Sequence, residues 1–167
     1  YIIVGEVRGE EAQTLFQAMN TGHTTYSTLH AGNVKEAINR LINDPINVPV
    51  AMFGALNLVL VQSLLYGDGK GFRRCLSLNE ISVSGTEINC TPIFIWNHSE
   101  DKFENRTENS KVFESIANTN GWDKEELKCR IQTRTDLLQK LADTGKISGK
   151  ELEASLRKLR IQENTHA

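Results

Sequence analysis

The first eight residues, YIIVGEVR, constrain the fold most, because an apolar run leads directly into a glutamate and an arginine. A run this apolar and β-branched is typical of a strand buried on both faces, as in the parallel sheet of an α/β protein. Polar side chains that follow such a strand emerge at its carboxyl end, where open α/β sheets bind their ligands. We therefore expect Glu6 and Arg8 at a ligand crevice, with Glu6 able to polarise a water or to lie near a bound cation.

The same strand begins at residue 1 of the sequence. A central strand of a parallel sheet needs a neighbour on each side, and no residues precede this strand to supply one of them. We therefore expect the chain to be part of a longer protein.

Composition narrows the class of protein. A chain of 167 residues holds one ordinary domain or two small ones, and a net charge of -2 with 24% charged residues gives no bulk affinity for nucleic acid. The three cysteines, Cys75, Cys90 and Cys129, form no CxxC pair, which argues against a zinc site and a disulfide framework. No signal peptide is expected, and a reducing, cytoplasmic setting is the plain interpretation.

One apolar stretch, Val50–Tyr66, could be mistaken for a membrane span. Polar residues interrupt it, and it falls short of the roughly 20 uninterrupted apolar residues that a spanning helix needs. We expect a short helix over residues 50–56 followed by a strand over residues 58–66.

Apolar periodicity predicts the remaining elements. Near the start, the pattern indicates a helix over residues 10–19, a second buried strand over residues 24–29, and a helix that Asn33 and Glu36 open in a near capping box. After the strand over residues 58–66, we expect a glycine-rich hairpin turn over 67–71, a strand over 72–83 with a bulge near Asn79, a strand over 88–96 and a loop over 97–110.

Two features complete this expectation. Pro92 lies inside the strand over residues 88–96 and places that strand at a sheet edge. The tail is helical: one helix ends before Gly121, a second runs from Asp123 to Gly145, and a third is opened by the capping box of Ser148 and Glu151.

Histidines flank the second predicted strand, His23 at its start and His30 at its end. Their spacing is not a ligand signature of the HExxH kind, and a structural role is common for a histidine at a strand end. The interpretation that fits best is an imidazole that donates to phosphate oxygens at the crevice. The glycine-rich stretch over 67–71 lacks the GxxxxGK[ST] pattern and is interpreted as a hairpin turn, not a phosphate loop.

Three segments together, IIVGEVRGEEA, TGHTTYSTLHAGN and the helix over residues 37–41, resemble the type II/IV secretion-system ATPases. These are hexameric RecA-like motors of type II secretion, type IV pili and archaella. The resemblance covers residues 1–66 at the level of motifs, and the meander and helical tail resemble the archaeal branch less specifically.

The resemblance implies an α/β fold: the C-terminal part of a RecA-like P-loop NTPase core, followed by a β-meander and a small helical subdomain. Residues 1–83 would hold the partial ATPase core, and residues 84–167 one more strand and the C-terminal helical extension. ATP and Mg²⁺ are the expected substrate and cofactor. The expected assembly is a homo-hexamer, cytoplasmic and peripherally associated with the membrane, acting on a membrane platform protein and not on nucleic acid.

The resemblance also assigns roles to residues. Glu6 is similar to the Walker B glutamate that orients and activates the attacking water, which makes it catalytic together with His30. His23 and His30 occupy the histidine box, whose members contact the γ-phosphate or the opposing domain. Arg8 pairs with Glu6 or reaches a neighbouring subunit, and with His23 it is assigned to nucleotide binding. No residue is assigned as a metal ligand.

One departure from the family pattern is clear: no GxxxxGK[ST] motif occurs in the 167 residues. We therefore expect these residues alone to hydrolyse little ATP, because the loop that cradles the phosphates is missing. The aspartate box, the N-terminal domain and a four-cysteine zinc module are absent as well. Two alternatives stay open: a non-catalytic interaction module in which residues 84–167 dock a partner, and a metal-dependent hydrolase that uses Glu6, His23 and His30.

Overall fold

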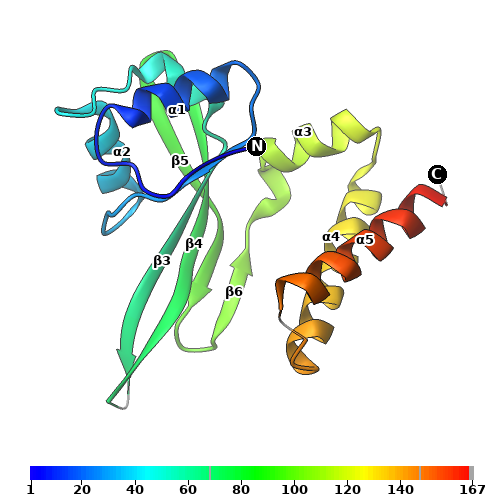
Figure 1. Ribbon diagram of the computed structural model, residues 1–167. Coiled ribbons are helices and arrows are strands. Elements are labelled where there is room, and N and C mark those ends of the chain that lie inside the picture. Colours follow the sequence, from blue (N-terminus) through cyan, green and yellow to red (C-terminus); the bar gives the residue numbers. More distant parts are fainter. Residues whose placement is uncertain (68, 147, 166–167) are drawn as a thin grey trace. The chain divides into compact units, whose positions relative to one another are not determined.

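The computed structural model describes residues 1–67, 69–146 and 148–165, and the chain forms two compact units, Tyr1–Glu114 and Ser115–Ala167 (Figure 1). The first unit holds a small parallel sheet, helices and a four-stranded antiparallel sheet. The second unit is helical, and α3 (Lys111–Asn120) begins in the first unit and ends in the second. The mixed α/β class is thus confirmed, at the level of helices and sheets.

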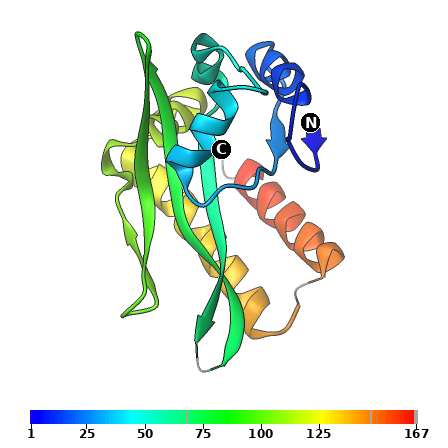
Figure 2. The same ribbon diagram turned by 90° about the vertical axis from the view of Figure 1, so that its left-hand side faces the viewer.

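The opening strand β1 (Ile2–Val4) pairs in parallel with β2 (Thr25–Ser27), with Ile3 opposite Tyr26 (Figure 2). The predicted parallel pairing is therefore confirmed. The prediction that both strands are buried is wrong for this chain, because Ile3 and Tyr26 are exposed. Within the described part of the chain, β1 and β2 pair only with each other, so the outer edge of each strand is unpaired.

Helices α1 (Glu11–Asn20) and α2 (Val34–Ile42) lie where the periodicity predicts them. The Oδ1 of Asn33 accepts from the backbone N of Glu36 at 2.9 Å, and the Glu36 carboxylate accepts from the backbone N of Gly32 at 2.8 Å. This reciprocal arrangement satisfies two amides at the start of α2 and is a shifted form of the predicted capping box.

The core of the first unit forms where these helices meet the short helix η1 (Val50–Ala55). The rings of Phe16 and Phe53 lie 4.9 Å apart at its centre. The predicted helix over residues 50–56 is confirmed as a 3-10 helix, and the apolar stretch that follows it is a strand. None of the described helices is long and apolar enough to cross a membrane.

The four-stranded sheet is an antiparallel meander of β3 (Leu58–Gly67), β4 (Lys70–Ser84), β5 (Glu87–Asn97) and β6 (Lys102–Asn105), in that order. A register shift after Leu78 confirms the predicted bulge, and β3 and β4 form the predicted hairpin. Residue 68 of the hairpin turn lies outside the described residues. The boundary expected after residue 83 falls inside β4, one residue before that strand ends, whereas the compact units divide after Glu114.

Two predictions about this sheet are wrong. Strand β5 is not an edge strand, because β6 pairs with it over Phe94–Asn97, and residues 97–110 contain β6 and the short helix η2 (Thr107–Asn109) in place of a loop. Pro92 is tolerated because it lies at the register shift opposite Asn79 and outside the part of β5 that pairs with β6.

The start of α3 is held on the sheet by Glu80 of β4, a buried carboxylate. It accepts hydrogen bonds from the Ser110 hydroxyl at 2.5 Å, the Lys111 backbone N at 3.0 Å and the Val112 backbone N at 3.2 Å. A carboxylate at a helix N-terminus satisfies amides that have no partner within the helix. Glu80 therefore fixes where α3 leaves the first unit.

In the second unit, α4 (Lys124–Asp143) and α5 (Gly149–Thr165) begin at the predicted caps. Asp123 accepts from the backbone N of Glu126 at 2.8 Å. The backbone N of Ser148 donates to the Glu151 carboxylate at 3.2 Å, and the backbone N of Glu151 donates to the Ser148 hydroxyl at 3.4 Å, which confirms that capping box.

Candidate functional site

Glu6 lies just beyond the carboxyl end of β1, on a segment anchored by its neighbour Val7. The Val7 side chain is buried in the core, and its backbone N donates to the carbonyl of Thr28 at 2.8 Å. The Thr28 hydroxyl donates in turn to the carbonyl of Gly5 at 2.5 Å. These bonds continue the parallel pairing past the ends of β1 and β2, so the segments that follow the two strands lie side by side.

Both oxygens of the Glu6 carboxylate have partners. One accepts from the Arg8 guanidinium at 2.6 Å, and the other lies 3.3 Å from Nε2 of His30. The Glu6 side chain is 27% exposed, whereas those of Arg8 and His30 are 74% and 84% exposed. The structure thus brings together three of the four residues that the sequence assigns to the site, around a carboxylate that solvent can still reach.

The electrostatics keep this carboxylate charged. The hydrogen bond from Arg8 lowers the pKa of Glu6 below its ordinary value of 4.5 and is a larger effect than desolvation, which acts in the opposite direction. The nearby charges of Arg8, His30 and Arg40 each add a smaller lowering. The hydrogen bond with Glu6 also raises the pKa of Arg8. An ionised carboxylate is a hydrogen-bond acceptor only, which suits a group that holds a water by one of its protons.

Two residues that the sequence analysis did not single out support this cluster. The Glu11 carboxylate accepts from the backbone N of Arg8 at 2.5 Å and from that of Gly9 at 2.9 Å, which fixes the turn between Glu6 and α1. The guanidinium of Arg40, in the last turn of α2, donates to the backbone carbonyl of His30. The run GEVRGEE signals the role of Glu11, but no pattern in the sequence signals that of Arg40.

His23 is not part of the cluster. It precedes β2, at the end opposite to His30, and its Nδ1 lies 3.2 Å from the Thr21 hydroxyl. In the part of the chain that the structure describes, no group of three or more His, Cys, Asp or Glu side chains is arranged to hold a metal ion. The metal-hydrolase alternative, which needs Glu6, His23 and His30 together, therefore gains no support.

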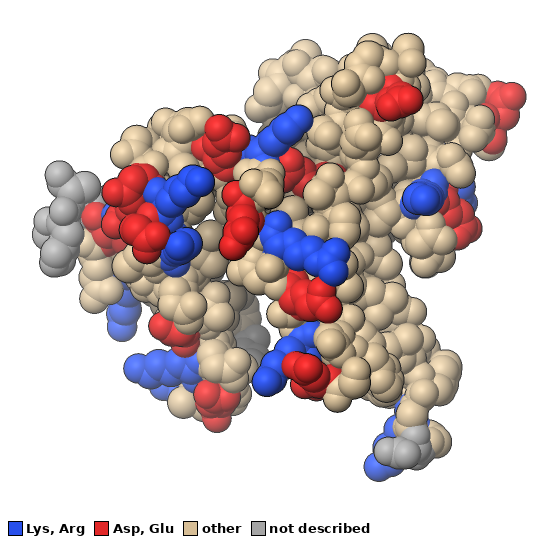
Figure 3. All heavy atoms as spheres, turned by 180° about the vertical axis from the view of Figure 1, so that it is seen from behind, with Lys and Arg blue, Asp and Glu red and all other residues tan. Residues whose placement is uncertain are grey.

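The charges on one face of the surface are mixed. On the face shown in Figure 3, Lys and Arg side chains are interspersed with Asp and Glu. The described side chains on this face therefore form no broad field of one sign.

Comparison with known proteins gives a consistent result. Residues 1–96 match the family described as Type II/IV secretion system protein, a segment that includes the whole Glu6 cluster. The chain is similar to two uncharacterised proteins of Methanocaldococcus jannaschii, each 38% identical over 147 residues, covering 84% and 86% of the chain. It is also similar to the type IV pilus assembly ATPase PilB of Thermus thermophilus, at 33% identity over 98 residues.

The extent of these matches differs. The chain spans 27% and 54% of the two M. jannaschii proteins, and the PilB match covers 52% of the chain and 11% of PilB. Because the M. jannaschii matches cover more of the chain than residues 1–96, part of the region after residue 96 also has a counterpart in those proteins.

Proposed function

Since this chain belongs to the type II/IV secretion system protein family, we propose that it is the C-terminal portion of a hexameric ATPase motor. The motor would hydrolyse ATP to drive type II secretion or the assembly of a type IV pilus or archaellum. Residues 1–83 would be the end of a RecA-like core, and β1 and β2 would be two of its parallel strands. The similarity to a pilus assembly ATPase supports the activity, and the parallel pair supports the fold.

The observation that carries the proposal is the Glu6 carboxylate at the carboxyl ends of two parallel strands, held ionised by Arg8. Open α/β sheets bind ligands at this edge. Phosphoryl transfer requires a group that orients the attacking water and charges that stabilise the phosphoryl oxygens, with little covalent chemistry from the protein. Glu6 would orient the water by accepting one of its protons in a hydrogen bond.

Arg8 and His30 would supply the positive charge. In the structure each takes one oxygen of Glu6, and both side chains are largely exposed and so can turn without disturbing the core. In the hydrolytic state, Arg8 or His30 would turn toward the phosphate or a neighbouring subunit and free an oxygen of Glu6 for the water. The role predicted for His23, contact with nucleotide or with the opposing domain, belongs to this proposal as well.

The residues present fit part of an ATP site. Arg8 and His30 offer donors of the kind that bind phosphate oxygens, but the sequence has no loop of the GxxxxGK[ST] type to cradle them. The surroundings of Glu6 do not fit direct coordination of Mg²⁺, because nitrogen atoms of Arg8 and His30 already contact the two carboxylate oxygens. The cradle and the Mg²⁺ ligands would come from residues outside this sequence.

Assembly and location follow from the same proposal. A homo-hexamer would place the exposed Arg8 near a subunit boundary, and the motor would act peripherally at the cytoplasmic membrane on a platform protein. Residues 84–167 would form the C-terminal extension of each subunit.

The test is ATP hydrolysis by the full-length protein that carries this chain. Glu6→Gln removes the negative charge but keeps the side-chain size, and we expect steady-state phosphate release to fall about 100-fold or more, the scale of a lost general base. Glu10→Gln is the matched control, because Glu10 is exposed and its side chain does not cap α1. Wild-type rates in the Glu6→Gln protein would overturn the proposal.

A further inference from the structure

Arg40 lies beside the Glu6 cluster although it comes from a different element. Its guanidinium donates to the backbone carbonyl of His30, the residue whose imidazole contacts Glu6. Its charge also acts on Glu6 in the direction that keeps the carboxylate ionised. Arg40 thus acts on both members of the Glu6–His30 contact. It binds the His30 backbone through a hydrogen bond, and its positive charge acts on the Glu6 carboxylate.

The helix that carries Arg40 is fixed at its start and along its length. Asn33 and Glu36 satisfy the amides at the first turn of α2, and the apolar face of α2 lies in the core through Val34, Ile38 and Leu41. An arginine in the last turn also suits the negative end of the helix dipole. The backbone of Arg40 is therefore a firm support for a hydrogen bond to a neighbouring loop.

His30, in contrast, lies on a connecting segment. It follows the end of β2, and its side chain is largely exposed. A largely exposed side chain on a connecting segment is mobile unless its backbone is restrained. The bond from Arg40 supplies such a restraint at the residue that must face Glu6.

We propose that Arg40 is a positioning residue of this site: it holds the backbone of His30 so that the imidazole stays within reach of Glu6. This inference rests on the proposed function of the Glu6 cluster. Arg40 would act through His30 and Glu6 and would not itself touch the reacting atoms.

The first measurement needs no catalysis. Nuclear magnetic resonance titration of residues 1–167 would follow the Glu6 carboxyl, on which the charges of Arg8, His30 and Arg40 act. The chemical shifts of the His30 ring, recorded on the same samples, would report its position beside Glu6. With Arg40→Ala, the pKa of Glu6 rises, because an attractive charge is lost, and the His30 ring signals shift. With Arg40→Lys, the pKa stays close to wild type because the charge is kept. Lys35→Ala, on an exposed position of the same helix, changes neither signal.

The second measurement is hydrolysis by the full-length protein. Arg40→Ala lowers kcat about 10-fold with a smaller change in KM, as expected for a misplaced catalytic group, and Arg40→Lys recovers part of the loss. Unchanged Glu6 and His30 signals in Arg40→Ala would overturn the inference even where Glu6→Gln abolishes activity. Full activity of Glu6→Gln would overturn the proposed function instead, whatever the titration shows.

Discussion

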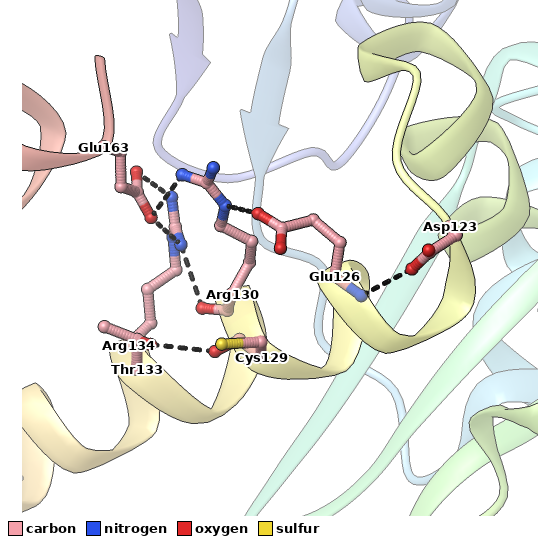
Figure 4. Close-up of polar contacts among 7 residues, drawn as sticks. All are labelled: Asp123, Glu126, Cys129, Arg130, Thr133, Arg134 and Glu163. Atoms are coloured by element: carbon pink, nitrogen blue, oxygen red, sulfur yellow. Dashed lines mark hydrogen bonds and ion pairs between the residues drawn. The ribbon is translucent and has the colours of Figure 1, made fainter. Parts of the chain in front are cut away.

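The two units of this protein each hold a glutamate between two nitrogen-bearing side chains, with different consequences. In the first unit, Glu6 contacts Arg8 and His30, which are mostly exposed. In the second, Glu163 of α5 lies between Arg130 and Arg134 of α4, and Arg134 binds it through two nitrogens at 2.8 and 2.9 Å (Figure 4). Glu163 and Arg130 are only 16% and 20% exposed. Both glutamates thus contact nitrogen atoms of basic side chains, but the partners of Glu6 are far more exposed than Arg130 in the second unit.

This difference separates a group that can react from one that joins two helices. Arg130 also binds Glu126 at 2.6 Å and lies 5.0 Å from the centroid of the Trp122 ring, so its guanidinium is held on several sides. Such a network fixes the position of α5 on α4 and leaves Glu163 no free oxygen. Glu6, at the end of a strand and beside cations that can turn away, keeps access to solvent.

The largest loss of stability is expected at a third carboxylate, the buried Glu80, which has neutral donors as its partners. Glu80→Ala leaves the Ser110 hydroxyl and two backbone amides at the start of α3 without an acceptor. We expect the free energy of unfolding to fall by about 2–4 kcal/mol, measured by urea denaturation. Glu87→Ala, on an exposed position of β5, is the control and should change stability little. Equal stability of both variants would show that the hydrogen bonds of Glu80 to the start of α3 contribute nothing to stability.

A smaller effect is expected at Glu163. Glu163→Gln removes the charge that binds Arg130 and Arg134, and we expect a loss of about 1–2 kcal/mol at neutral pH. Burial raises the pKa of Glu163, but the hydrogen bonds and the charges of Arg134 and Arg130 together outweigh it, and the net shift is downward. The stabilisation is therefore present above the ordinary pKa of 4.5 and is lost as the pH falls through the lowered value.

Urea denaturation across this pH range checks the sign. The difference between wild type and Glu163→Gln should shrink below pH 4.5, whereas Glu153→Gln, exposed on the same helix, should follow wild type throughout. A difference that persists undiminished in acid would contradict the ion-pair account of the α4–α5 contact.

The smallest effect on stability is expected at Arg8. Because Arg8 and its bond to Glu6 are at the surface, Arg8→Ala should leave the unfolding transition where it is. It should raise the pKa of Glu6 toward 4.5, because the hydrogen bond that lowers it is lost. Titration of the Glu6 carboxyl checks this, and an unchanged pKa would mean that the pair does not persist in solution.

Local signals in the sequence predict much of the fold. The caps of α2 and α5 and the bulge in β4 depend on neighbouring residues, and all three are confirmed. The burial of β1 and β2 was predicted wrongly because burial depends on the strands and helices that pack around a strand, which no local pattern in the sequence encodes. Strand β6, a short polar segment with every residue exposed, exists because β5 offers it an edge, and its composition gives no sign of that.

The candidate site divides in the same way. Glu6, Arg8 and His30 follow from motifs at the ends of strands, and the parallel pairing brings them together. Arg40 was missed because its contact is with a backbone carbonyl, which any residue provides, so no pairing of residue types reveals it. The sequence already places His23 and His30 at opposite ends of a strand, and the structure shows that it is His30 that lies at the end where Glu6 follows β1.

The most direct test of the central claim is single-turnover cleavage of ATP by the full-length protein, with nucleotide binding measured on the same samples. For Glu6→Gln we predict cleavage about 100-fold slower or more, with an affinity for ATP close to wild type. For Glu163→Gln, measured well below its unfolding temperature, we predict cleavage at the wild-type rate. Equal cleavage rates in the Glu6→Gln and wild-type proteins would contradict the account, because Glu6 would then be, like Glu163, a structural carboxylate.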